Sequence, residues 1–134
     1  MQEIQTRSTK LEAEFSQMTE WEKKYEMIIQ KGKNLPELPE SMRLEKNLVK
    51  GCQSQVWLFA EKKPDGRVHF FADSDALIVK GLIAVLMDLF QDLDTASIVQ
   101  ADLEVFKRIG LNQHLSPSRS NGLQAMVEQI KIYA

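Results

Sequence analysis

Apolar residues in the first third of the chain recur at the spacing of an amphipathic helix. One such face is formed by Leu11, Phe15 and Met18. A second helix is predicted from Trp21, because Thr19–Glu22 fits a capping box. In that motif the threonine hydroxyl and the acidic side chain satisfy free amides at the start of the helix. We expect Gly32 to end this helix, since two prolines follow it closely.

The middle of the chain has the pattern of a β-hairpin. A loop, with a possible short strand around Met42–Leu44, precedes two segments rich in strand formers, Gln55–Glu61 and Arg67–Asp73. Between these segments stands Lys63–Gly66, which reads Lys-Pro-Asp-Gly and has the residues that a tight turn requires. If the turn centres on its proline and aspartate, the residue numbers of paired positions sum to about 129.

Four helices are predicted after the hairpin. The first, Ala76–Phe90, is apolar nearly all round and should be covered on both sides, with Ser74 or Asp75 as its cap. Capping also explains the neighbouring Asp73 better than paired acid–base chemistry. The remaining helices are marked by a start at Thr95, an end at Gly110 and the cap-proline pair Ser116–Pro117. The expected fold is therefore α+β, with a small antiparallel sheet of a hairpin plus a short strand packed against several helices.

Composition narrows the classes of function. The chain has 134 residues and a net charge of −2, which suits one domain over 1–134 and provides no basic surface for nucleic acid. The most apolar segment, Ala76–Phe90, is interrupted by Lys80 and Asp88 and is too short to span a membrane. The N-terminus has no apolar run typical of a secretory signal, so we expect a cytoplasmic protein. The two histidines lie far apart, so no metal site is predicted.

The single cysteine, Cys52, is the strongest candidate for chemistry. A lone cysteine is most often a buried small hydrophobe, but this one lies between Gly51 and the polar residues Gln53 and Ser54. Extending the predicted ladder brings Cys52 towards residue 77, in the first turn of the central helix. The helix N-terminus lowers the pKa of a nearby thiol and Asp75 opposes that effect, so the net shift stays open.

A thiol without a second cysteine suits two kinds of reaction. It can hand sulfur on to another protein, or it can act in a cysteine hydrolase, which requires a histidine base. His69 is the only nearby candidate for that base, and a partly exposed strand position explains it better. A third possibility is an interaction module in which the thiol is not used.

Three segments in register resemble the SufE family of sulfur-acceptor proteins, which includes CsdE. The segments are Gly51–Leu58, Asp73–Leu82 and His114–Leu123, and the helix at Trp21–Tyr25 matches as well. The resemblance runs from about Trp21 to the C-terminus. It implies a fold like that of iron–sulfur scaffold proteins of the IscU type, which use several cysteine ligands where this chain has one.

The resemblance also implies a mechanism. A PLP-dependent cysteine desulfurase, SufS-like or CsdA-like, would pass persulfide sulfur to Cys52, be stimulated by this transfer, and the sulfur would go to an iron–sulfur scaffold. Gly51, Gln53 and Ser54 would support the loop, and Asp75 and Arg119 would meet the desulfurase. PLP would belong to the partner, so no cofactor is expected in this chain, which would be an accessory protein and not an independent enzyme. The alternative is a regulatory module that binds the desulfurase without taking sulfur.

Overall fold

A computed structural model describes residues 2–50, 54–101, 104–111 and 115–134. The elements run in the order α1 (Gln2–Ser16), α2 (Trp21–Lys33), the 3-10 turns η1 (Glu40–Met42) and η2 (Glu45–Asn47), β1 (Val56–Lys62), β2 (Arg67–Ser74), α3 (Leu77–Phe90), β3 (Leu93–Asp94), α4 (Thr95–Gln100), α5 (Glu104–Arg108) and α7 (Pro117–Tyr133). The strands form one antiparallel sheet in the order β1-β2-β3. The predicted α+β fold is confirmed.

The hairpin of β1 and β2 closes through a three-residue loop. Gly66 N–H donates to the carbonyl oxygen of Lys63 at 2.9 Å, and Lys63 N–H donates to that of Arg67 at 2.7 Å. Gly66 has a φ of 85°, the left-handed conformation that follows a tight turn in such loops. Paired residue numbers sum to 130, as in Val56 with Ser74, so the predicted register was wrong by one. The extra glycine position in the loop is the cause.

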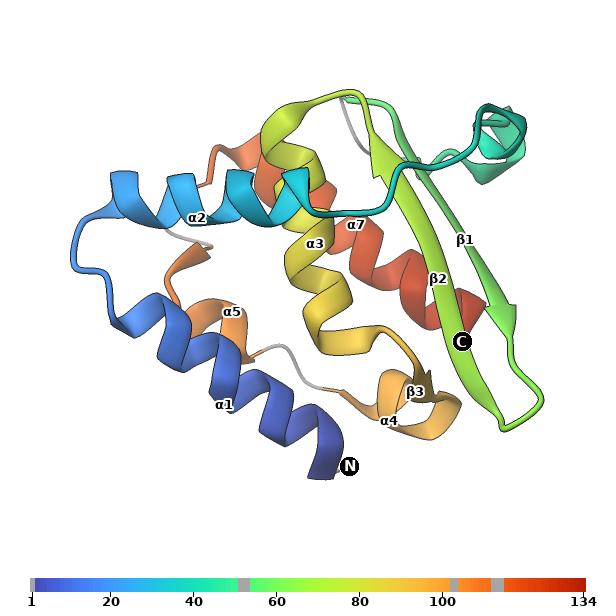
Figure 1. Cartoon of the computed structure of the whole chain (residues 1–134), viewed down its shortest axis with the longest axis horizontal. Helices are drawn as coiled ribbons and strands as arrows, with labels where there is room; N and C mark the ends of the chain where they lie inside the picture. The colour runs from blue at the N-terminus through green and yellow to red at the C-terminus, as the bar shows by residue number, and fades with distance from the viewer. Residues whose placement is uncertain (1, 51–53, 102–103, 112–114) are drawn as a thin grey trace.

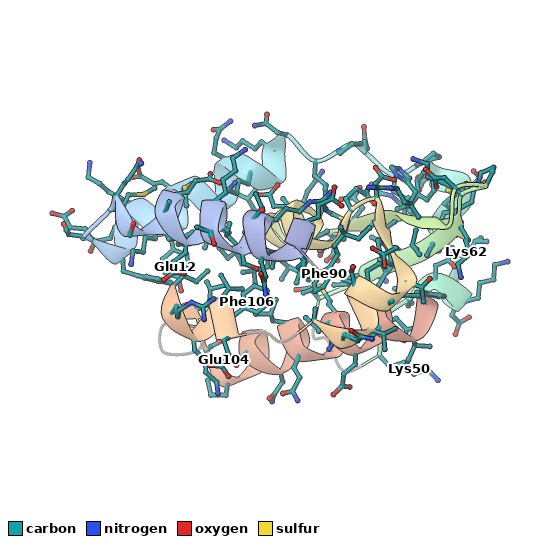
Figure 2. All side chains as sticks on the ribbon, turned by 90° about the horizontal axis from the view of Figure 1, so that it is seen from below. Glu12, Lys50, Lys62, Phe90, Glu104 and Phe106 are labelled. Atoms are coloured by element: carbon teal, nitrogen blue, oxygen red, sulfur yellow. The ribbon has the colours of Figure 1, made fainter. Side chains whose placement is uncertain are left out.

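The inner face of the hairpin packs on α3 and α7. In Figure 1, α2 crosses in front of α3 and α7 passes behind it, so α3 lies in the middle of the molecule. In Figure 2, Phe90 and Phe106 lie between the layer of α1 and α2 and the layer of α7. Both side chains are buried. The helix predicted to be covered on both sides is therefore the centre of the core.

Helices α2 and α3 cross at two glycines. A Cβ added to Gly32 would lie 2.6 Å from the backbone nitrogen of Gly81, and one added to Gly81 would meet the carbonyl oxygen of Ile28. Only hydrogen fits in either position. The prediction that Gly32 ends its helix was wrong, because α2 continues to Lys33 and the glycine serves close packing.

The predicted start signals of two helices were also wrong. Helix α2 has Glu20, in extended conformation, as its N-cap with no capping side-chain hydrogen bond, so the box Thr19–Glu22 stands one residue too early. Helix α3 has Ala76 as N-cap and starts at Leu77. The Ser74 hydroxyl accepts the amide of Ala76 at 3.2 Å, before the helix begins. Asp73 and Asp75 bind other groups and do not cap α3.

The later boundaries agree with the sequence more closely. Helix α4 starts at Thr95 and α7 at Pro117, and Gly110 with a φ of 82° follows α5. The segment Met42–Leu44 is not a strand, since Met42 ends η1 and Leu44 is the N-cap of η2. No helix in the described ranges is long and apolar enough to cross a bilayer.

Candidate functional site

Of the predicted site residues, Ser54 and Asp75 are described, and they lie beside the connection that precedes β1. Gly51, Cys52 and Gln53 are outside the described residues, and so is the side chain of Arg119, whose backbone belongs to the first turn of α7. Five described residues at the two ends of this connection bond to one another, and we call them the loop base: Val49, Gln55, Val56, Ser74 and Asp75.

On its N-terminal side the loop base is closed by backbone pairing. Val49 N–H donates to the carbonyl oxygen of Val56 at 2.8 Å. The preceding residue, Leu48, forms an antiparallel bridge with Trp57. The chain thus leaves the sheet at Val49 and rejoins it at Val56, so both ends of the connection are held at one place. Lys50, the last described residue before the gap, lies at the periphery (Figure 2).

On its C-terminal side the loop base is held by side chains. The Ser74 hydroxyl donates to the carbonyl oxygen of Gln55 at 2.7 Å. The amide of Gln55 donates to the Asp75 carboxylate at 3.1 Å, and the amide of Asp75 donates back to the Gln55 carbonyl at 3.3 Å. The pairing of β1 with β2 therefore continues one step beyond the strands, up to the turn that begins α3. Asp75 joins the loop base directly, and its contact is with Gln55.

A buried carboxylate, Asp73, lies next to the loop base and is fully shielded from solvent. One oxygen accepts Arg43 Nη2 at 2.9 Å and the amide of Leu38 at 3.2 Å. The other accepts the amide of Ser74 at 2.8 Å and lies 3.4 Å from Lys80 Nζ. Two cations thus surround one buried anion, which offsets part of the cost of removing its charge from water.

Sequence reasoning missed this cluster of Arg43, Asp73 and Lys80. The segment between α2 and β1 covers the outer face of the hairpin at this end, where Arg43 lies 5.1 Å over the ring of Trp57. A local signal did exist. Asp73 follows two apolar residues in a predicted strand, and it lies opposite Trp57 across the hairpin. An acidic side chain in such a place is buried only when it is bound to a group of opposite charge.

The described surroundings of the loop base include exposed apolar side chains. Leu77, in the first turn of α3, is 54% exposed, and Leu44, between η1 and η2, is 43% exposed. Among the described residues no three histidine, cysteine, aspartate or glutamate side chains are grouped to hold a metal ion. The described part of the site therefore combines the exposed carboxylate of Asp75 with exposed apolar side chains.

His69 is at the other end of the hairpin. It pairs with Glu61, and its Nδ1 lies 2.9 Å from the Asp92 carboxylate. Glu61 lies six residue steps along the strand from Gln55, a distance of about 20 Å. A histidine so far along the hairpin from the loop base gives no support to the hydrolase interpretation.

Residues 9–134 match the model of a family described as SufE, Fe-S metabolism associated domain. This chain belongs to the SufE family. Members of the family are associated with iron–sulfur metabolism, and that association holds for this chain. The solution structure of a hypothetical protein from Thermus thermophilus has a similar fold, with a TM-score of 0.78 over 95% of this chain and 92% of that one. At 18% identity the likeness shows the fold alone.

Proposed function

We propose that this SufE-family chain accepts sulfur on Cys52 from the persulfide of a PLP-dependent cysteine desulfurase, stimulates that enzyme, and carries the sulfur to iron–sulfur cluster assembly. The observation that carries the proposal is the combination of family membership with a single cysteine in the whole chain. A single thiol cannot resolve an intramolecular disulfide, so sulfur bound to it is available for transfer to a second protein.

The transfer conserves atoms and electrons. The Cys52 thiolate attacks the outer sulfur of the enzyme persulfide and forms a new S–S bond. The S–S bond of the enzyme breaks, and its electron pair stays on the enzyme cysteine as a thiolate. The persulfide is thereby moved without net oxidation or reduction. The desulfurase thiol is freed for another turnover, which explains why acceptance stimulates the enzyme.

The described geometry supports this role in two ways. The loop base holds both ends of the cysteine connection at the open end of the hairpin, opposite the turn Lys63–Gly66, and a rigid scaffold of this kind commonly supports functional side chains. Exposed Leu77 adds apolar surface to the start of α3 beside Asp75, a combination suited to a transient partner. We assign loop support to Gly51, Gln53 and Ser54, and partner contact to Asp75 and Arg119.

Intact mass spectrometry tests the proposal. The protein is incubated with free cysteine and a SufS-like or a CsdA-like desulfurase with its PLP, and is then weighed before and after reduction. We expect a gain of one sulfur atom that a reductant removes and that Cys52→Ser lacks. Desulfurase turnover is followed in the same mixtures.

Two results would contradict sulfur acceptance. If neither type of desulfurase adds sulfur although one of them binds the protein, the proposal fails. If Cys52→Ser stimulates the enzyme as well as the wild type does, the chain acts as a regulatory binding module.

A further inference from the structure

The loop base depends on a residue that does not belong to it. Asp73 reaches both sides of the connection through its two oxygens. On one side it binds Arg43, whose guanidinium covers Trp57, the residue that pairs with Leu48. On the other side it binds the amide of Ser74, whose hydroxyl holds the carbonyl of Gln55. The two sides of the loop base therefore meet at one carboxylate.

Stability alone does not explain a carboxylate in this place. Burying a charge is costly even when it is paired, and well-packed apolar residues often stabilise a fold as much or more. A carboxylate with four donors does what an apolar residue cannot do, because it fixes the direction of each partner. The donors come from the segment after α2, from β2 itself and from α3.

We propose that Asp73 is a positioning residue that sets the geometry of the loop base, acting through Arg43 on the Val49 side and through Ser74 on the Gln55 side. The inference rests on the proposed function in one respect, namely that the loop base serves to present Cys52 to a partner protein. Lys80 ties the same carboxylate to the second turn of α3. The start of α3 and the loop base are thereby held in a fixed relation.

The two halves of the arrangement can be separated by mutation. Arg43→Met keeps an unbranched side chain over Trp57 but removes the bond to Asp73, so it should loosen mainly the Val49 side. Asp73→Asn keeps the shape but removes the charge, so it should loosen both sides. Arg43→Lys restores a cation to face Asp73 and should recover most of the wild-type behaviour.

Arg7→Met is a matched control. The Arg7 side chain is 25% exposed, against 26% for Arg43, and it also bonds to distant parts of the chain. Its guanidinium donates to the carbonyl oxygens of Leu89 and Gln91, at the far end of α3. If Arg43→Met acted only by lowering the overall stability, it should therefore change amide exchange and alkylation in the same way as Arg7→Met.

Amide hydrogen exchange gives the first readout, and it does not require sulfur transfer. We expect exchange at Val49 to rise at least tenfold in Arg43→Met with a smaller rise at Gln55, and to rise tenfold at both in Asp73→Asn. The amide of Phe70, which bonds to the Gln91 side chain near the other end of the hairpin, should change less than twofold. Arg7→Met should leave Val49 and Gln55 unchanged.

The rate of alkylation of Cys52 by iodoacetamide, followed across pH, gives the second readout. We expect at least a threefold change in Asp73→Asn and Arg43→Met and recovery in Arg43→Lys. The proposal is overturned if exchange rises equally at Val49, Gln55 and Phe70, or rises at none of them. It is also overturned if Arg7→Met alters alkylation as strongly as Arg43→Met does. Failure of sulfur acceptance in the wild type would refute the proposed function and leave these results unaffected.

Discussion

Replacing Gly32 with alanine tests the crossing of α2 and α3 on which the core is built. The added Cβ would lie 2.6 Å from the nitrogen and 2.8 Å from the Cα of Gly81. Ordinary contact begins at 3.4 Å, so the two helices would have to separate by about 0.8 Å, the difference between this limit and the shorter distance. Both atoms belong to the backbone and cannot rotate away, so the strain falls on the helix pair.

The expected free energy follows from two opposing effects. Alanine is favoured over glycine in a helix interior by about 1 kcal/mol. Overpacking a close contact costs about 1–3 kcal/mol, and a clash between backbones belongs at the upper end. We therefore expect Gly32→Ala to lower the free energy of unfolding by about 2 kcal/mol, the opposite sign to the effect of alanine at an open helical position.

Urea denaturation measures this change as a lower midpoint with an unchanged slope. The melting temperature should fall by roughly 3–5 °C per kcal/mol for a chain of this size. Lys33→Ala is the control, since Lys33 is the exposed next residue of α2 and its replacement should stay within about 0.5 kcal/mol. A Gly32→Ala protein more stable than the wild type would refute the reasoning about the crossing.

Three further substitutions test local contacts. Burial raises the pKa of Asp92, but bonds to His69 and Lys63 lower it more. The ionised carboxylate therefore stabilises the fold above the ordinary pKa of aspartate, and this stabilisation is lost as the pH falls through the lowered pKa of the folded protein. In urea denaturation Asp92→Asn should be less stable than the wild type by less than about 1 kcal/mol near neutral pH, and this difference should vanish in acid. Asp94→Ala should lower the urea midpoint, because the carboxylate that caps α4 is lost. Ser74→Ala should lose about 1 kcal/mol and speed amide exchange at Gln55.

Local chemistry explains what the sequence could predict. The turn Lys63–Gly66 favours a hairpin because its proline presets one backbone dihedral and its glycine accepts the positive φ that follows. The segment that forms α3 is apolar on nearly all sides, so it has no polar face that could be turned to solvent. Its central position therefore follows from the pattern of its residues. Pro117 begins α7 because proline has no amide to leave unpaired there.

Contacts between distant segments explain what the sequence could not predict. Gly32 has the signature of a helix end, and only its neighbour Gly81 on another helix shows that it serves packing. The register was wrong by one because a loop of two residues and a loop of three contain the same turn residues. Asp73 has partners 35 and 30 residues away, Leu38 and Arg43, so local patterns favoured capping for it.

The structure gives one physical reason why two of the motifs occur together. Gln55, Val56 and Trp57 face Asp75, Ser74 and Asp73 across the hairpin or its one-step extension. The segment that follows Cys52 and the segment that begins α3 are thus opposite sides of one ladder, and a change in either alters the loop base. Ser74 and Asp75, some twenty residues further along the chain, therefore hold Gln55, which follows the cysteine loop. Substitutions at Asp73 and Ser74 should for this reason affect Cys52 chemistry more than their distance in the sequence would indicate.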